Sequence, residues 1–392
     1  MRDSVPSVPA GPAAVVWNAR LRAGDWAPPL ACFLLGEAVI AAASIHAGYG
    51  FPGPGDLRRG DAHNYLSIAR HGYVLYSCTT HCPAGVPTGW EGNTAWFPLY
   101  SLLLAPFVHA GLPAGPVGAV VSAACLLGVL TLLWRGFLRE QRAVAGVTAL
   151  ATAAVFPGAV YFYAIFPLSL LALTTVAAVY FARRDAWLPA GVCAALGAAS
   201  YELGSIVPAV IGLWCLVLGS GTFRARALRA GAIWVAGLAV PGSIIAADRL
   251  MTGRWDAFLE VQAHFRSGLQ DPLVALGSAK ASTLGYFHDP TRISLAPSVQ
   301  MIFVTTLVAA GLVVAALGRL DYDRPIAVLV GATWLFPFLA GAAFSFYRAE
   351  AALLPVVLLT RRLPALLQAV FLAVAVAIAF MVAVLFFERQ IV

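Results

Sequence analysis

Asp61 is the acidic residue whose surroundings in this sequence most favour a chemical role. It opens the stretch DAHNYLSIARHGY at 61–73, where apolar residues from Tyr65 to Tyr73 have the spacing of one helix face. An aspartate before such a run commonly caps the helix by accepting backbone N–H bonds. A carboxylate in this position also suits a general base, which removes a proton from a hydroxyl as its oxygen attacks. The two roles are compatible, and the sequence leaves both open.

Two further patterns near Asp61 raise the question of metal binding. Asp56 lies five residues earlier, but two carboxylates at that spacing make a poor metal site, so we expect no bound metal. Cys78 and Cys82 flank His81 in CTTHC. In an oxidising compartment the two cysteines favour a disulfide. Zinc binding together with His81 and free thiols are the alternatives.

The composition predicts that membrane helices position these residues. Of 392 residues, 60% are hydrophobic and only 11% charged, and the mean hydropathy is +0.83. Apolar stretches of about 20 residues, long enough to cross a bilayer, recur from end to end. We therefore expect an all-α polytopic membrane protein with about 11 transmembrane helices. Residues 1–27 would be a cytoplasmic tail and 28–392 a single transmembrane domain.

The basic residues predict the orientation of the chain in the membrane. Cytoplasmic loops carry an excess of Arg and Lys, which assigns the segments 135–142, 183–185, 223–229, 318–324 and 361–362 to the cytoplasm. This rule also explains the net charge of +7 without nucleic-acid binding, which we do not expect. The outer loops are then residues 48–95 and 248–296. The apolar segment near 96–110 would be an interfacial helix.

Several stretches follow one another in the order found in a known family. They are GDAHNYLSIARHGY at 60–73, NTAWFPLYSLLLAPF at 93–107, FPGAVYFYAIFPLSLLAL at 156–173, TGRWDAFLEVQAHF at 252–265 and SFYRAEAALLP at 345–355. Taken together, these stretches resemble the PIG-V type mannosyltransferases of the GT-C superfamily. The resemblance covers most of the chain and implies a GT-C-type helical bundle with interfacial helices in the long outer loops.

The resemblance also implies a reaction and roles for particular residues. It implies an inverting glycosyltransferase that moves a sugar, typically mannose, from a polyprenyl-phosphate donor to an acceptor hydroxyl on the outer face of the cell membrane. Asp61 would be the catalytic base, with Arg348 and Arg59 on the donor phosphate. The residues expected to bind substrate are His63, Asn64, Gln262, His264 and Glu202. We expect no cofactor beyond this lipid-linked donor, and a monomer surrounded by membrane lipids.

Some of these residues have simpler interpretations. Arg348 could pair with Glu350 or reach from a helix end to the membrane surface. Gln262 and His264 could be solvated loop residues, and the arginines near Asp61 could contact lipid headgroups. Glu202, in contrast, falls in an apolar region, where a carboxylate suggests a function or a buried partner.

The sequence departs from the family pattern at three positions, which leaves other functions open. Gly60 stands where a tryptophan would precede the acid, Leu168 replaces an acid, and Tyr201 replaces an arginine. The acceptor is therefore open: an envelope glycan, a lipid, a protein or a natural product. One alternative is a transporter or flippase of lipid-linked sugars, which would predict inverted repeats. Another is a catalytically degenerate relative that only binds partners.

Overall fold

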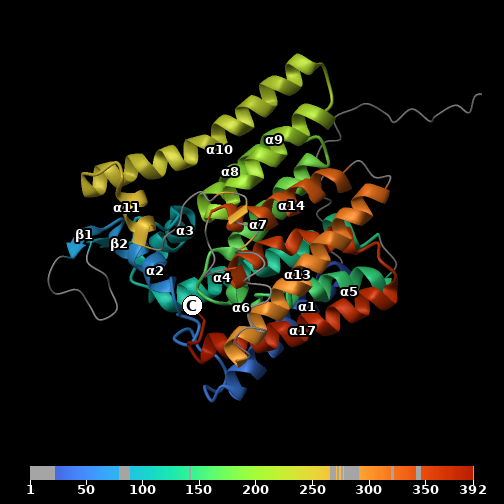
Figure 1. The fold of residues 1–392 in the computed structure, drawn as a ribbon, viewed down its shortest axis with the longest axis horizontal. Coiled ribbons are helices and arrows are strands. Elements are labelled where there is room, and N and C mark those ends of the chain that lie inside the picture. The colour runs from blue at the N-terminus through green and yellow to red at the C-terminus, as the bar shows by residue number, and fades with distance from the viewer. Residues whose placement is uncertain are drawn as a thin grey trace, which may run out of the picture.

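Helices form most of the structure, a computed structural model (Figure 1). It describes residues 23–78, 89–140, 143–264, 271, 273–274, 277, 291–318, 322–340 and 346–391. The greater part of the expected tail at 1–27 and residues 265–270, 272, 275–276 and 278–290 of the second outer loop lie outside the described residues.

The helices of the first half of the chain are α1 (Ala23–His46), α2 (Ala62–His71), α3 (Pro98–His109), α4 (Ala114–Leu133), α5 (Ala143–Ala154), α6 (Val160–Tyr163), α7 (Leu168–Ala182) and α8 (Trp187–Ser200). Those of the second half are α9 (Ile206–Leu218), α10 (Phe223–Thr252), α11 (Ala257–His264), α13 (Arg292–Leu317), α14 (Asp323–Leu339), α15 (Phe346–Ala349), α16 (Val357–Thr360) and α17 (Ala365–Phe387). The π-helical turn η1 (Trp134–Leu138) and the 3₁₀ turns η2 (Glu202–Ser205) and η4 (Glu350–Val356) join some of them.

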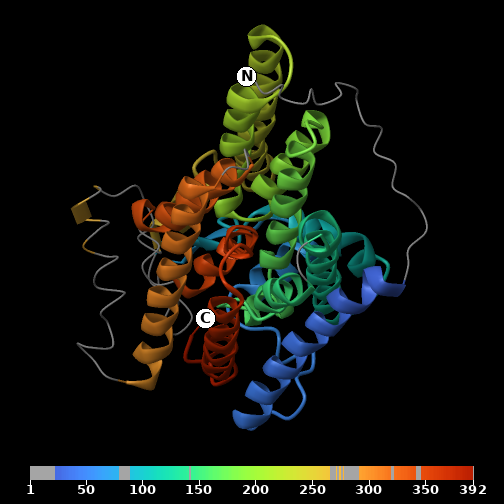
Figure 2. The ribbon, with the colours of Figure 1, turned by 90° about the vertical axis from the view of Figure 1, so that its right-hand side faces the viewer.

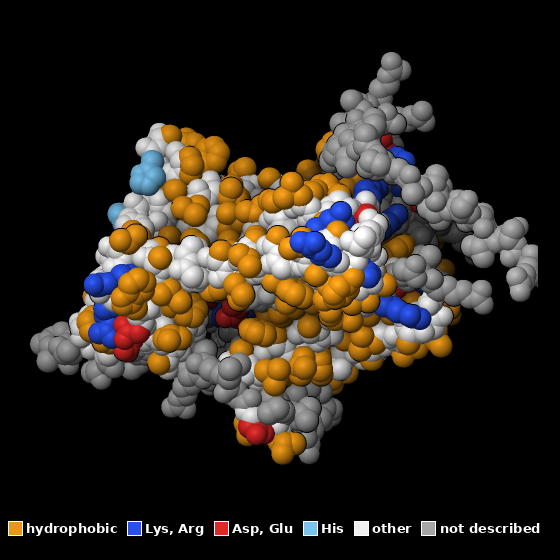
Figure 3. All heavy atoms as spheres, turned by 90° about the horizontal axis from the view of Figure 1, so that it is seen from above, with side chains coloured by type: hydrophobic (Ala, Val, Ile, Leu, Met, Phe, Trp, Pro, Cys, Tyr) orange, Lys and Arg blue, Asp and Glu red, His pale blue; other side chains and the backbone are white. Residues whose placement is uncertain are grey.

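Five helices of the described chain are long and apolar enough to cross a membrane. They are α1, α4 with η1, α10, α13 and α17, and shorter apolar helices pack between them. On the face shown in Figure 3, charged side chains gather toward the two ends and hydrophobic side chains cover most of the length between. The predicted all-helical, apolar architecture is confirmed at this level, and the count of about 11 crossings stays a prediction.

The arrangement of the long helices is clearest in Figure 2. There α1 and α13 lie on opposite flanks with α17 between them, and α17 packs against both. In Figure 1, α2, α11 and the hairpin lie at one end of the bundle, and the turn between α9 and α10 lies at the other. The helix α3 packs against α2 at the first end. Its 12 residues rise only about 18 Å, less than the roughly 30 Å of a bilayer core, which favours the interfacial helix expected there.

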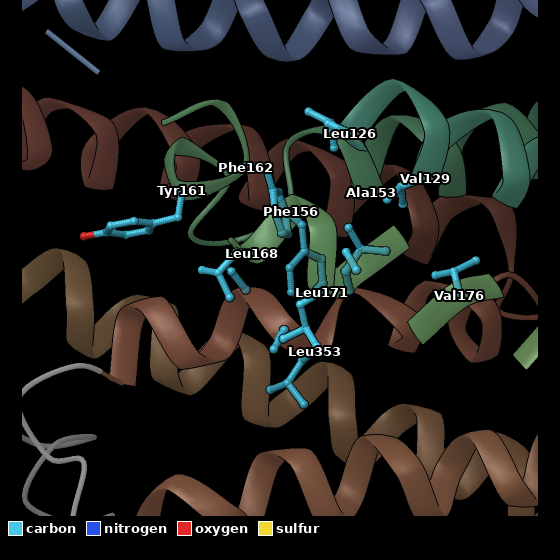
Figure 4. Close-up of a cluster of buried hydrophobic side chains, with 14 of the residues drawn as sticks. Leu126, Val129, Ala153, Phe156, Tyr161, Phe162, Leu168, Leu171, Val176 and Leu353 are labelled. Atoms are coloured by element: carbon cyan, nitrogen blue, oxygen red, sulfur yellow. The ribbon is translucent and has the colours of Figure 1, made fainter. Parts of the chain in front are cut away.

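The core is built around α7, which is buried on nearly every side. A helix that is apolar all round belongs in the interior of a bundle, and α4, α8 and η4 pack around this one. Figure 4 shows Phe156, Leu168, Leu171 and Leu353 meeting in this core, with the hydroxyl of Tyr161 pointing away from the cluster. The hydroxyl of Tyr161 therefore marks a polar edge of the core.

One predicted span is interrupted. The sequence predicts a single helix over 160–182, but the chain leaves the helix after Tyr163 and begins a new one at Leu168. The reason is Pro167, which has no N–H to donate and disfavours helical backbone at the residue before it. The break turns the short segment between α6 and α7 into a wall of the site described below.

A small β-hairpin that the sequence analysis did not foresee follows α2. Strands β1 (Leu75–Cys78) and β2 (Gly89–Gly92) pair antiparallel, with Leu75 opposite Gly92. Asn93 joins the hairpin to α2: its Oδ1 accepts from Val74 N at 2.8 Å, and its Nδ2 donates to the carbonyl of Gly72 at 3.2 Å. These bonds fix the far end of the helix that Asp61 precedes.

The opposite end of the bundle contains a buried ion-pair network. Asp323 lies at the start of α14. Its Oδ1 accepts a hydrogen bond from Nη2 of Arg361 at 3.1 Å, and its Oδ2 forms an ion pair with Nη2 of Arg362 at 2.8 Å. The side chains of Asp323 and Arg361 are 0% and 1% exposed. Arg361 also donates to the hydroxyl of Tyr322 at 3.0 Å, and Gln368 donates to the carbonyl of Arg361 at 2.9 Å. The network joins the starts of α14 and α17 to the end of α16.

Candidate active site

Asp61 and Arg348, 287 residues apart in sequence, form an ion pair. Asp61 stands just before α2, and Arg348 is on α15. Nη1 of Arg348 donates a hydrogen bond to Oδ2 of Asp61, and the two side chains are 12% and 25% exposed. The structure thus joins the predicted base to the predicted phosphate-binding residue at the edge of the bundle interior.

The expectation that Asp61 caps α2 is only half met. Asp61 occupies the N-cap position, but within the described structure its side chain gives α2 no capping hydrogen bond. Its backbone is in the helical region, at φ −64° and ψ −7°, whereas a capping residue is usually extended. The Asp61 carboxylate faces Arg348 instead, so the local helix signal identified the position but not the interaction.

Arg348 does not pair with Glu350, which was the alternative partner. Side chains two positions apart on a helix point in different directions. Glu350 begins η4 and is itself buried, at 4% exposure. Burial lowers the pKa of Arg348, but Asp61 together with Tyr201, Tyr161 and Tyr347 raises it by more, so the pKa lies above its ordinary value. Arg348 is therefore a permanent cation.

Aromatic rings from separate parts of the chain surround the pair. The guanidinium of Arg348 lies 5.5 Å from the ring centre of Phe166, close enough for a cation–π contact. The ring of Phe166 in turn packs against Tyr65, Tyr161 and Tyr201 at centre distances of 5.6, 5.4 and 6.3 Å. These rings shield the pair from water on one side, which strengthens its electrostatic interactions.

Tyr65 remains a neutral phenol in this environment. Burial raises its pKa well above the ordinary value, and the nearby Tyr201 and Asp61 raise it further. Tyr65 can therefore serve as a polar wall or hydrogen-bonding group, while Asp61 is the better candidate for accepting a proton.

Glu202 is the second carboxylate of the site. It begins η2, between α8 and α9, and lies within electrostatic range of both Arg348 and Asp61. One cation thus stands among two carboxylates. The sequence analysis placed Glu202 in the site because of its apolar surroundings, and the fold brings it to the pair.

The backbone that carries Arg348 is held from two sides. Gln300 of α13 is fully buried, and its Nε2 donates to the carbonyl of Tyr347 at 2.8 Å. On the other side Gly158, at φ +77°, approaches so closely that an added Cβ would lie 2.8 Å from the same carbonyl oxygen. Only glycine readily combines that backbone angle with that approach. Arg348 is therefore positioned by residues remote in sequence.

The N-terminal side of the site is also tied to its neighbours. The carbonyl of Tyr65 accepts from Ser101 Oγ of α3 at 2.8 Å. The amide of Ile165 donates to the carbonyl of Leu57 at 3.2 Å, which joins the loop before α2 to the break between α6 and α7. These bonds hold Asp61 beside the aromatic wall.

The predicted site residues next to Asp61 in the chain make contacts of their own. The guanidinium of Arg59 stacks 5.2 Å from the ring centre of Tyr49. His63 is exposed, with Nδ1 2.7 Å from the carbonyl oxygen of Gly60, and Asn64 is buried within α2. Their contributions to substrate binding stay predictions.

The residues predicted from the second outer loop lie on α11. The carbonyl of Ala257, its first residue, accepts from Thr94 Oγ1 at 3.0 Å, and Phe258 packs edge-on against Phe97. Gln262 belongs to this helix and is partly exposed. The side chain of His264 lies outside the described part of the structure. Substrate binding by Gln262 and His264 therefore stays a prediction.

Cys78, at the end of β1, is disulfide-bonded, and Cys32, Cys125, Cys193 and Cys215 are free thiols. Cys82 and His81 lie outside the described residues. The pairing of Cys78 with Cys82 accordingly stays a prediction.

The aromatic wall and Gln300 were not predicted from the sequence. Tyr161 and Phe166 lie in the quoted stretch FPGAVYFYAIFPLSLLAL, and its density of aromatic residues beside a proline was the available signal. The signal for Gln300 was weaker: it is an amide side chain near the start of an apolar span.

Comparisons with known proteins do not support the family resemblance. No family model matches this sequence, and no curated protein matches it. The site itself and the residues that resemble the GT-C pattern are the observations that bear on function.

Proposed function

We propose that the protein is an integral-membrane glycosyltransferase that moves a sugar, with mannose as the first candidate, from a polyprenyl phosphate to a hydroxyl acceptor. The observation that carries the proposal is the meeting of Asp61 with Arg348 beside a buried aromatic wall. A carboxylate suits proton removal from a hydroxyl, and a guanidinium suits a phosphate leaving group. The reaction needs both.

In the proposed reaction the acceptor oxygen attacks the anomeric carbon of the donor sugar. The bond from that carbon to the phosphate oxygen breaks, and polyprenyl phosphate leaves with the bonding electrons. Asp61 takes the proton of the attacking hydroxyl, and Arg348 offsets the negative charge that develops on the departing phosphate. Attack opposite the leaving group inverts the configuration at the anomeric carbon.

The position of the pair in the fold supports an outer-face site. The clusters with Arg135, Arg183, Arg226, Arg229 and Arg361 belong to the segments assigned to the cytoplasm. The turn between α9 and α10 precedes one of these clusters and lies opposite the end that holds α2 and α11 (Figure 1). By the positive-inside rule, Asp61 would face outward, where a lipid-linked donor could reach it from the membrane.

Sugar transfer is the measurement that tests this proposal. Purified protein in lipid nanodiscs, given radiolabelled polyprenyl-phosphate mannose and an envelope extract as acceptor, is expected to release polyprenyl phosphate and form a labelled product. Arg348→Gln should lower the rate about 10²–10³-fold, the effect of removing a donor that stabilises developing negative charge.

Two results would oppose the proposal. Full activity in Arg348→Gln would show that Arg348 does not stabilise the departing phosphate. Label that crosses the bilayer of proteoliposomes still attached to its lipid, with no transfer, would favour the transporter alternative.

A further inference from the structure

The ion pair poses a conflict for the proposed reaction. While Nη1 of Arg348 is bound to Oδ2 of Asp61, the guanidinium is partly occupied. The same bond occupies Oδ2 of Asp61, which is then not free to accept a hydrogen bond from an acceptor hydroxyl. Neither residue can take up its full role while they remain paired in this way.

The charges around Arg348 favour exchange of one anion for another. Asp61 and Glu202 already provide two carboxylates for one cation in a largely buried place. A phosphate that joined Asp61 on Arg348 would place two anions on one guanidinium, and like charges at close range repel strongly where water is scarce. Binding of the phosphate is therefore favoured if one carboxylate moves away.

Asp61 is the carboxylate that can leave at low cost. Its side chain is 25% exposed, whereas that of Arg348 is 12% exposed and its backbone is fixed through Tyr347 by Gln300. In the described structure α2 receives no capping bond from the Asp61 side chain. Rotation of that side chain breaks no helix contact that the structure shows.

We propose that the Asp61–Arg348 pair is a latch that a phosphate ester opens. The phosphate replaces Asp61 on Arg348, and the released carboxylate oxygen is then free to accept the proton of an acceptor hydroxyl. This inference rests on the proposed function and adds regulation to it. The base becomes effective only when a donor occupies the site, so an empty site does not activate stray hydroxyls.

Binding of a polyprenyl phosphate without a sugar tests the latch, because it needs no acceptor and no turnover. Affinity would be measured by native mass spectrometry of protein in nanodiscs. Asp61→Asn removes the competing charge, and it is expected to bind about tenfold or more tightly, the worth of a hydrogen bond to a charged group. Arg348→Gln should lose binding. Asp56→Asn, which removes a charge nearby but outside the pair, should bind as the wild type does.

The outcomes separate the latch from the proposed function. If Arg348→Gln loses binding but Asp61→Asn binds equally or less tightly, the latch is wrong and the phosphate site stands. If wild-type protein does not bind the lipid, or Arg348→Gln binds it as well, both are wrong. Asp61→Ser provides a second variant without the charge, and should show the same gain if Asp61→Asn folds poorly.

Discussion

Asp61→Asn is expected to abolish nearly all sugar transfer while leaving the fold intact. Asparagine has the shape of aspartate, but it carries no charge and cannot take the acceptor's proton. Loss of a general base lowers rates by about 10²–10⁴-fold. The measurement is the initial rate of radiolabelled sugar transfer by purified protein, together with the unfolding temperature in the same detergent.

The matched control for this variant is Asp56→Asn. Asp56 lies in the same loop, and its Oδ2 accepts a hydrogen bond from the backbone N of Gly53 at 3.0 Å. Its replacement should leave the transfer rate unchanged. A fully active Asp61→Asn protein would show that Asp61 is not the base, whatever Asp56→Asn does.

The largest loss of stability is expected from Asp323→Asn, at the end of the bundle opposite the site. This change removes the negative charge that faces Arg361, whose side chain is 1% exposed. Removing one partner of a fully buried ion pair costs about 3–5 kcal/mol, because the other charge stays buried without compensation. The unfolding temperature and the free energy of unfolding in detergent measure the effect.

Asp256→Asn is the control for that prediction. Asp256 also pairs with an arginine, Arg254, but the two side chains are 49% and 32% exposed, and ion pairs in contact with water contribute little. Asp256→Asn should therefore unfold close to the wild-type temperature. Equal unfolding temperatures for Asp323→Asn and the wild type would show that the buried network does not stabilise the bundle.

Local patterns predicted the elements better than the contacts between them. The helix after Asp61 follows from its apolar spacing, and the long spans follow from hydropathy. The hairpin was missed because its strands, LYSC and GWEG, are short and show no alternation of buried and exposed residues. The break before α7 was missed although Pro167 signals it, because the apolar composition continues across it.

The contacts within the candidate site were even less predictable from local sequence patterns. Asp61 and Arg348 were both selected, one by its place before a helix and both by the family resemblance, but nothing local indicates that they pair. Gly158 and Gln300 both approach the carbonyl of Tyr347, and these contacts arise only when α13 and the segment before α6 each pack against α15. Periodicity describes one element at a time, so contacts of this kind lie beyond it.

The most direct measurement of the central claim is a structure determined with a polyprenyl-phosphate sugar bound. The phosphate oxygens should accept hydrogen bonds from Arg348, and the anomeric carbon should face a carboxylate of Asp61 that has left the ion pair. A lipid phosphate bound elsewhere, with Asp61 and Arg348 still joined, would contradict the claim.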